Sequence, residues 1–105
     1  MKKLLWWLIA GTKGGINRAK IIETLRKRPY NANQLSEILG VDYTTARHHV
    51  DVLVKENLIS PTGDKYGNMY FLTPLMEENY GVFEEILERI GNNKIGGDKD
   101  IKGGI

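Results

Sequence analysis

The stretch that decides the fold is residues 31–57, which read NANQLSEILGVDYTTARHHVDVLVKEN. Asn31, followed three residues later by a glutamine, forms a capping-box pattern that predicts the start of a helix. Gly40 supplies a left-handed end for that helix, and Asp42 caps a second helix that runs to about residue 56. Two helices joined by a short turn centred on a glycine are the signature of a helix-turn-helix.

The second of these helices is predicted to have one apolar and one polar face. Ala46, Val50 and Leu53 fall within about 60° of one another on a helix, so we expect them to face the core. The outward face then carries hydrogen-bond donors, which are the side chains needed to contact base edges and phosphates in a major groove. These predicted DNA contacts are Tyr43, Thr44, Thr45, Arg47, His48 and Lys55. Asp51 lies on the same face and is expected to pair with Arg47 or Lys55, each four residues away.

A β-hairpin is predicted after the helix pair. Residues 58–59 and 69–72 are short apolar runs typical of strands, and the loop between them is rich in turn-forming residues. Lys65 and Tyr66 lie at the tip of this wing, residues 60–69, and are predicted to contact DNA. The expected fold is therefore a winged helix-turn-helix, mainly α with a small β-hairpin, with extra helices at both ends of the chain.

From residue 17 to residue 74 the chain resembles the winged helix-turn-helix of ArsR-type transcriptional regulators, especially the short archaeal ones. The residues that carry the resemblance are 33–40, 43–50, 53–59 and 70–73. The resemblance implies that the helix from Tyr43 enters the major groove and that the hairpin touches the flanking backbone or minor groove. It also implies that His49 lies at the edge of the core.

Metal sensing is not expected. The founding members of the family hold a metal through cysteines in the helix before the recognition helix, and this chain contains no cysteine. Thiolate-bound metal is thereby excluded, and no cofactor is predicted. His48 and His49 are adjacent, so they diverge by about 100° on a helix and are unsuited to share a metal ion.

The N-terminus carries an apolar run, LLWWLIA, over residues 4–10. This run is far shorter than the ~20 residues of a membrane-spanning helix, and no small-x-small cleavage site follows it. A signal or membrane anchor remains the minor alternative. The main expectation is a short helix with Leu4, Leu5, Trp7 and Leu8 packed in the core or against a partner. Because the adjacent Trp6 points about 100° away from Trp7, a dimer contact is favoured.

A further helix is predicted to begin at Thr73 and Pro74, with apolar side chains recurring every three or four residues up to Ile90. The two ends of the chain carry more large apolar side chains than one small domain can hide, which favours pairing with a second copy. The predicted dimer contacts are Leu4, Trp6, Trp7, Leu8, Met76, Tyr80, Phe83, Ile86, Leu87 and Ile90.

With 105 residues, the chain has room for one domain. Its predicted parts are an N-terminal helix and turn (1–15), the winged helix-turn-helix (16–73), a dimerisation helix (74–90) and a glycine-rich disordered tail (91–105). Residues 1–60 hold ten basic and five acidic side chains, whereas residues 61–105 hold five basic and eight acidic ones. A basic front half and an acidic back half are expected of a protein that binds a polyanion with the front half.

The function that these patterns favour is sequence-specific binding of double-stranded DNA by a cytoplasmic, homodimeric transcriptional regulator. The alternative left open is a winged helix that contacts other proteins within a larger transcription assembly. An acidic or apolar outward face on the recognition helix would have favoured that alternative. No nucleophile–base pair or metal-ligand cluster is visible in the sequence, so an enzyme is not expected.

Overall fold

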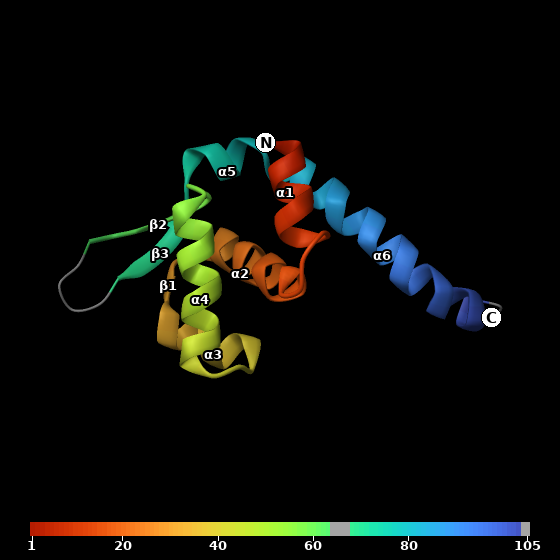
Figure 1. The fold of residues 1–105 in the computed structure, drawn as a ribbon, viewed down its shortest axis with the longest axis horizontal. Helices are drawn as coiled ribbons and strands as arrows, with labels where there is room; N and C mark the ends of the chain where they lie inside the picture. Colours follow the sequence, from red (N-terminus) through yellow and green to blue (C-terminus); the bar gives the residue numbers. More distant parts are fainter. Residues whose placement is uncertain (64–67, 104–105) are drawn as a thin grey trace.

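The computed structural model describes residues 1–63 and 68–103, and of residues 92–103 it describes only the backbone (Figure 1). The elements in chain order are α1 (Lys2–Ile9), α2 (Gly15–Lys27), β1 (Tyr30–Asn31), α3 (Ala32–Leu39), α4 (Tyr43–Lys55), β2 (Ile59–Pro61), β3 (Met69–Leu72), α5 (Pro74–Glu78) and α6 (Tyr80–Gly103). The predicted fold class, a mainly helical winged helix-turn-helix, is confirmed.

The helix-turn-helix is formed by α3 and α4, and local hydrogen bonds set its boundaries. The Asn31 side chain accepts from the backbone N–H of Gln34 at 2.7 Å, and the Gln34 side chain accepts from that of Asn31 at 2.9 Å. Gly40 ends α3 with φ 71°, a left-handed conformation that glycine adopts without steric cost. The Asp42 carboxylate accepts from the backbone N–H of Thr45 at 2.9 Å and starts α4.

The wing is an antiparallel hairpin of β2 and β3, with Ile59 opposite Leu72. A third strand, β1, pairs with the other edge of β3, so the order within the described sheet is β1-β3-β2. The hairpin was predicted from the sequence, whereas β1 was not. With two residues, β1 is too short to show the alternation by which a strand is recognised in a sequence.

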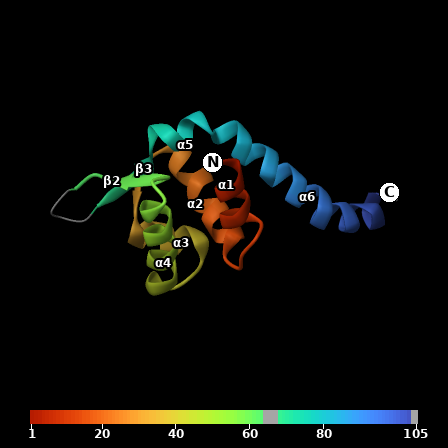
Figure 2. The ribbon, with the colours of Figure 1, turned by 45° about the horizontal axis from the view of Figure 1, so that its top comes forward.

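Helices from both ends of the chain complete one hydrophobic core. Leu5 and Leu8 of α1 are almost fully buried, as are Phe83 and Ile86 of α6. Figures 1 and 2 both show α1 lying beside the first turns of α6, and Figure 1 shows it above α2. The wing and the far end of α6 lie at opposite ends of the molecule in both views. The domain is therefore closed by sequence-distant helices.

Three features of the N-terminal half differ from what the sequence indicates. Asn17 is a good N-cap residue by type and predicts a helix start there, but α2 begins at Gly15 with Gly14 as its N-cap. Trp7 is 56% exposed, because α1 buries the opposite side, Leu5 and Leu8, against the core. Ile38 falls at helical spacing with Leu35 and Leu39, a pattern that predicts one apolar stripe, but it is exposed because α3 packs through its Leu35 side.

The predicted single C-terminal helix is divided at Asn79, whose side chain donates to the Leu75 carbonyl at 2.9 Å. The second part, α6, continues through Gly103, whereas the sequence predicted disorder from residue 91. No proline occurs in residues 91–103, so every backbone N–H there is available for the helical ladder despite the glycines. None of the described helices is long and apolar enough to cross a membrane.

Candidate nucleic-acid interface

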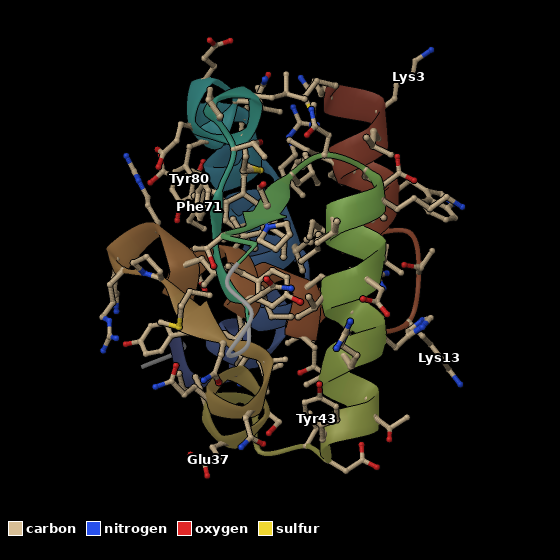
Figure 3. All side chains as sticks on the ribbon, turned by 90° about the vertical axis from the view of Figure 1, so that its left-hand side faces the viewer. Lys3, Lys13, Glu37, Tyr43, Phe71 and Tyr80 are labelled. Atoms are coloured by element: carbon tan, nitrogen blue, oxygen red, sulfur yellow. The ribbon has the colours of Figure 1, made fainter. Side chains whose placement is uncertain are left out.

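The outer face of α4 is the first component of the candidate interface. Ala46, Val50 and Leu53 are fully buried, so the inner face of the helix is fixed as predicted. The side chains predicted to contact DNA all lie exposed on the other faces: Tyr43, Thr44, Thr45, Arg47, His48 and Lys55. Figure 3 views the molecule from the wing side, with Tyr43 at the start of α4. The structure thus brings these six side chains onto one accessible helix surface.

Arg47 is held in place along this surface by two neighbours on its own helix. Its Nε donates to Oδ1 of Asp51 at 3.0 Å, and its Nη1 donates to the Tyr43 hydroxyl at 3.0 Å. The Asp51 carboxylate and the Tyr43 hydroxyl raise the pKa of Arg47 above its ordinary value. A guanidinium has five N–H donors, so three remain for a ligand. The predicted pairing of Asp51 with Arg47 is present, and it places the one acid of this face beside a cation.

A hollow of about 500 Å³ lies between the start of α3, the start of α4 and the wing. Six of the seven residues that line it carry a polar group, and none of the described lining residues is an acid: Asn31, Ala32, Asn33, Tyr43, Arg47, Asn68 and Tyr70. Sequence analysis missed Asn33 and Asn68 as candidate contacts. Asn33 could have been recognised as a candidate contact, because it lies in the first turn of an exposed helix. Asn68 could not, because only the folded wing brings it near α4.

The base of the wing is held by hydrogen bonds between its two strands. The N–H of Thr62 donates to the Met69 carbonyl at 2.9 Å, and the N–H of Gly63 donates to the Asn68 side chain at 3.1 Å. Lys65 and Tyr66, the predicted contacts at the wing tip, lie outside the described residues. Their contact with DNA stays a prediction.

The two histidines of α4 have different surroundings. His48 is exposed on the outer face, whereas His49 is 7% exposed and contacts Arg18 of α2. Burial, with the nearby charge of Arg18, lowers the pKa of His49. The expectation that His49 serves packing agrees with this position. Among the described residues, no three His, Asp or Glu side chains are grouped as a metal ion would require.

The predicted dimer contacts fall into two groups. Leu8, Met76, Tyr80, Phe83 and Ile86 are buried within their own chain, so their assignment to a surface between two chains is corrected. They are buried because α1 and α6 pack on each other and supply the core that the sequence alone assigned to a partner. The remaining five, Leu4, Trp6, Trp7, Leu87 and Ile90, are half-buried or exposed.

Two members of this second group, Trp6 and Ile90, line a hollow. It has a volume of about 420 Å³ and is lined by the apolar side chains of Trp6, Ile9, Ile16 and Ile90. Polar residues of the turn before α2 and of its first turn, Thr12, Lys13 and Asn17, complete the lining. A smaller hollow of about 190 Å³ continues from it toward Leu87. We call Trp6, Ile16, Leu87 and Ile90, together with Trp7 on the neighbouring surface of α1, the apolar patch. Trp6 and Ile16 are 40% and 58% exposed.

Comparison with known proteins supports the interpretation of residues 17–60. These residues match the family model described as "Bacterial regulatory protein, arsR family". The predicted resemblance to an ArsR-type winged helix-turn-helix is thereby confirmed for this part of the chain. No curated protein is similar enough in sequence to count as a match.

Solved structures of transcriptional regulators share the fold. The regulator BldR from Sulfolobus solfataricus superposes with a TM-score of 0.68 at 14% identity, covering 99% of this chain and 83% of that one. A MarR transcriptional regulator from Methanosarcina mazei Go1 gives 0.67 at 18% identity, covering 90% and 71%. The adhesin competence repressor from Streptococcus pyogenes gives 0.60 at 15% identity, and the 82% of this chain that aligns covers only 63% of that chain.

Proposed function

We propose that this chain, whose residues 17–60 match the ArsR family model, is a transcriptional regulator of the short archaeal type that binds specific double-stranded DNA as a homodimer. In this proposal α4 enters the major groove and the wing contacts the flanking backbone. The observation that carries the proposal is the outer face of α4, where six donor side chains are exposed on a helix whose other face is fully buried.

Arg47 is the side chain best suited to distinguish bases. Arginine contacts guanine through two parallel N–H donors, and such a contact is worth about 1–3 kcal/mol of discrimination. Asp51 and Tyr43 hold the guanidinium in advance, which lowers the conformational entropy lost on binding. The hollow beside it, whose described lining residues offer amide, hydroxyl and guanidinium groups and no acid, fits the sugar–phosphate backbone between the major-groove helix and the wing.

The apolar patch supports pairing with a second copy. Two tryptophans exposed at 40% and 56% are costly to leave in water, and the hollow between α1, α2 and α6 can receive a large side chain. A two-fold axis through this patch would keep the outer faces of both α4 helices free. Recognition helices that read a palindrome are set about 34–36 Å apart, one turn of duplex. Because the ligand is DNA, the proposed location is the cytoplasm.

The signal that controls such a regulator is proposed to be other than thiolate-bound metal. The chain has no cysteine, so a site of the kind found in the founding metal sensors cannot form. Calorimetry with zinc, cadmium and arsenite is expected to show no tight stoichiometric binding. Submicromolar binding of one ion per chain, lost when both histidines are replaced, would contradict this expectation.

The deciding experiment is a fluorescence-anisotropy titration with a random duplex pool and with duplexes selected from it, each at two salt concentrations. Specific binding predicts that selected duplexes bind at least about 10³-fold tighter than random ones, and that affinity falls as salt rises. No affinity for any duplex at low salt would contradict the proposal. In that case the alternative, a winged helix that contacts proteins in a transcription assembly, would take its place.

A further inference from the structure

A buried arginine joins the turn between α1 and α2 to the rest of the domain. Arg18 is only 5% exposed, and no carboxylate of the described residues pairs with it. Its Nε donates to the Leu8 carbonyl at 2.9 Å, and its Nη2 donates to the Lys13 carbonyl at 3.3 Å and to the Thr12 hydroxyl. The partial negative charge at the end of α1 therefore takes the place of a counter-ion.

The same guanidinium reaches the recognition helix through His49. Nη1 of Arg18 lies 3.3 Å from Nδ1 of His49, and both side chains are buried. A guanidinium can only donate hydrogen bonds, so Nδ1 has to be the unprotonated, accepting nitrogen of a neutral ring. Adding a proton to His49 would remove the acceptor and place two positive charges in direct contact within a buried site.

The turn is fitted closely to the ring of His49. Gly14 has φ 80°, and a Cβ added there would lie 2.5 Å from Cε1 of His49. This backbone approach leaves no room for a side chain between the turn and α4. Lys13, an exposed residue of the turn, is labelled beside α4 in Figure 3. A displacement of the His49 ring therefore requires the turn or the helix to move.

The charged surroundings of His49 all oppose its protonation. Burial lowers its pKa, and the positive charges of Arg18 on α2 and His48 on α4 lower it further. No described carboxylate from the turn, α2 or α4 acts in the opposite direction. The packed state consequently binds a proton less well than an opened state, in which the histidine has its ordinary pKa of about 6.5.

We propose that the proton is a regulatory ligand of this chain, and that acidification opens the contact between Arg18 and His49 and thereby weakens DNA binding by α4. The inference rests on the proposed function for its effect on DNA. The contact lies between the DNA-facing side chain of His48 and the apolar patch, since Lys13 and Gly14 also line the hollow next to Trp6. A change here alters how α4 is held relative to the surface proposed for the second copy, and hence the spacing of the two recognition helices.

The test compares the wild type with His49→Asn and His48→Asn between pH 7.5 and pH 5.5 at constant ionic strength. Asparagine at residue 49 places a side-chain amide near the position of Nδ1, and this amide does not titrate in the tested pH range. Thermal unfolding should show wild type and His48→Asn losing stability on acidification, whereas His49→Asn should lose clearly less. Equal losses in wild type and His49→Asn would overturn the inference.

DNA affinity is the second measurement. The wild type should lose affinity for a selected duplex by about fivefold or more over this pH range, and His49→Asn should not. His48→Asn keeps the contact between Arg18 and His49, so its affinity should also fall on acidification. A wild type whose DNA affinity is unchanged or rises on acidification would overturn the inference.

A third measurement uses the wild type alone and therefore does not depend on whether any variant folds. Nitrogen NMR of the histidine rings in the wild type should show Nδ1 of His49 unprotonated at pH 7.5 and a titration midpoint below about 6.5. A midpoint at or above that value would overturn the inference. If stability and NMR behave as expected but no duplex binds at pH 7.5, the proton-sensitive contact stands and the proposed DNA function fails.

Discussion

The outer face of α4 and the apolar patch are both exposed, but they expose opposite kinds of side chain. The face of α4 presents hydroxyl, imidazole and guanidinium donors, with its single acid already paired to Arg47. The apolar patch presents two indole rings and aliphatic side chains around a hollow. A surface of donors is suited to a hydrated polyanion, whereas a surface of large apolar groups gains free energy only when a partner removes it from water. This contrast agrees with the proposal that the first surface binds DNA and that a second copy covers the other.

The largest expected effect tests the boundary between the core and the apolar patch. Phe83→Ala should lower the free energy of unfolding by about 3–5 kcal/mol, because Phe83 is fully buried and its removal leaves a cavity. Trp7→Ala, on the exposed side of α1, should change the stability of the monomer far less. Urea unfolding at low protein concentration measures both. Similar losses would show that Trp7 is part of the core and would remove it from the patch.

The second prediction concerns pairing through the apolar patch. The double variant Trp6→Glu with Ile90→Glu should remain folded but become monomeric, because the new charges would be buried in the proposed interface. Its affinity for a palindromic duplex should fall by about 100-fold or more, since the two half-sites no longer act together. Analytical ultracentrifugation at micromolar concentration and circular dichroism measure assembly and folding.

Lys3→Glu is the matched control, because it adds negative charge to an exposed position of the same helix that does not line the hollows. This variant should pair as the wild type does. A monomeric wild type would contradict the dimer proposal, and so would a double variant that pairs normally.

The third prediction concerns base recognition on α4. Arg47→Ala should weaken binding to a selected duplex by about 1–3 kcal/mol and relax the preference for one base. Arg47→Lys keeps the charge but loses the planar pair of donors, so it should retain affinity for random DNA and lose the preference. Lys55→Ala should instead weaken all sequences alike and lower the salt slope by about one unit. If Arg47→Ala changes random and selected duplexes equally, Arg47 contacts phosphate and reads no base.

The smallest expected effect concerns the local structure that holds the DNA-facing helix pair. Asn31→Ala removes the hydrogen bond that the Asn31 side chain accepts from the backbone N–H of Gln34 and should cost about 1 kcal/mol of stability. Asn33→Ala, two residues later and exposed, should cost little stability but should weaken DNA binding if the hollow holds the backbone. Thermal unfolding and anisotropy separate the two roles. If Asn31→Ala and Asn33→Ala lose the same amount of stability, the capping box at Asn31 does not stabilise the helix more than an ordinary exposed residue does.

Sequence reasoning succeeded where the deciding interactions are local. The capping box at Asn31, the left-handed Gly40 and the Asp42 cap each join residues a few positions apart, so the sequence is sufficient to predict them. The inner and outer faces of α4 also follow from the sequence, because a helix repeats every 3.6 residues whatever surrounds it. The fold class and the exposed positions of Tyr43, Arg47 and His48 were predicted in this way.

Sequence reasoning failed where two distant segments compete for the same apolar side chains. The abundance of apolar residues in both end helices was read as one interface, but α1 and α6 bury most of them against each other. The same limitation applies to Arg18. In the sequence it is one more cation on a helix, and nothing marks it as the residue that reaches Leu8 and His49.

By itself, then, the sequence determined the helix-turn-helix, the hairpin after it and the face of α4 that carries hydrogen-bond donors. It also excluded thiolate chemistry, because each of these results depends only on residue type and short spacing. The tertiary structure alone decided which apolar side chains are interior and which are left for a partner, and it alone brought Arg18, Gly14 and His49 together. The physical reason is that burial and long-range contacts depend on how helices from both ends of the chain are packed, and helical periodicity carries no information about that choice.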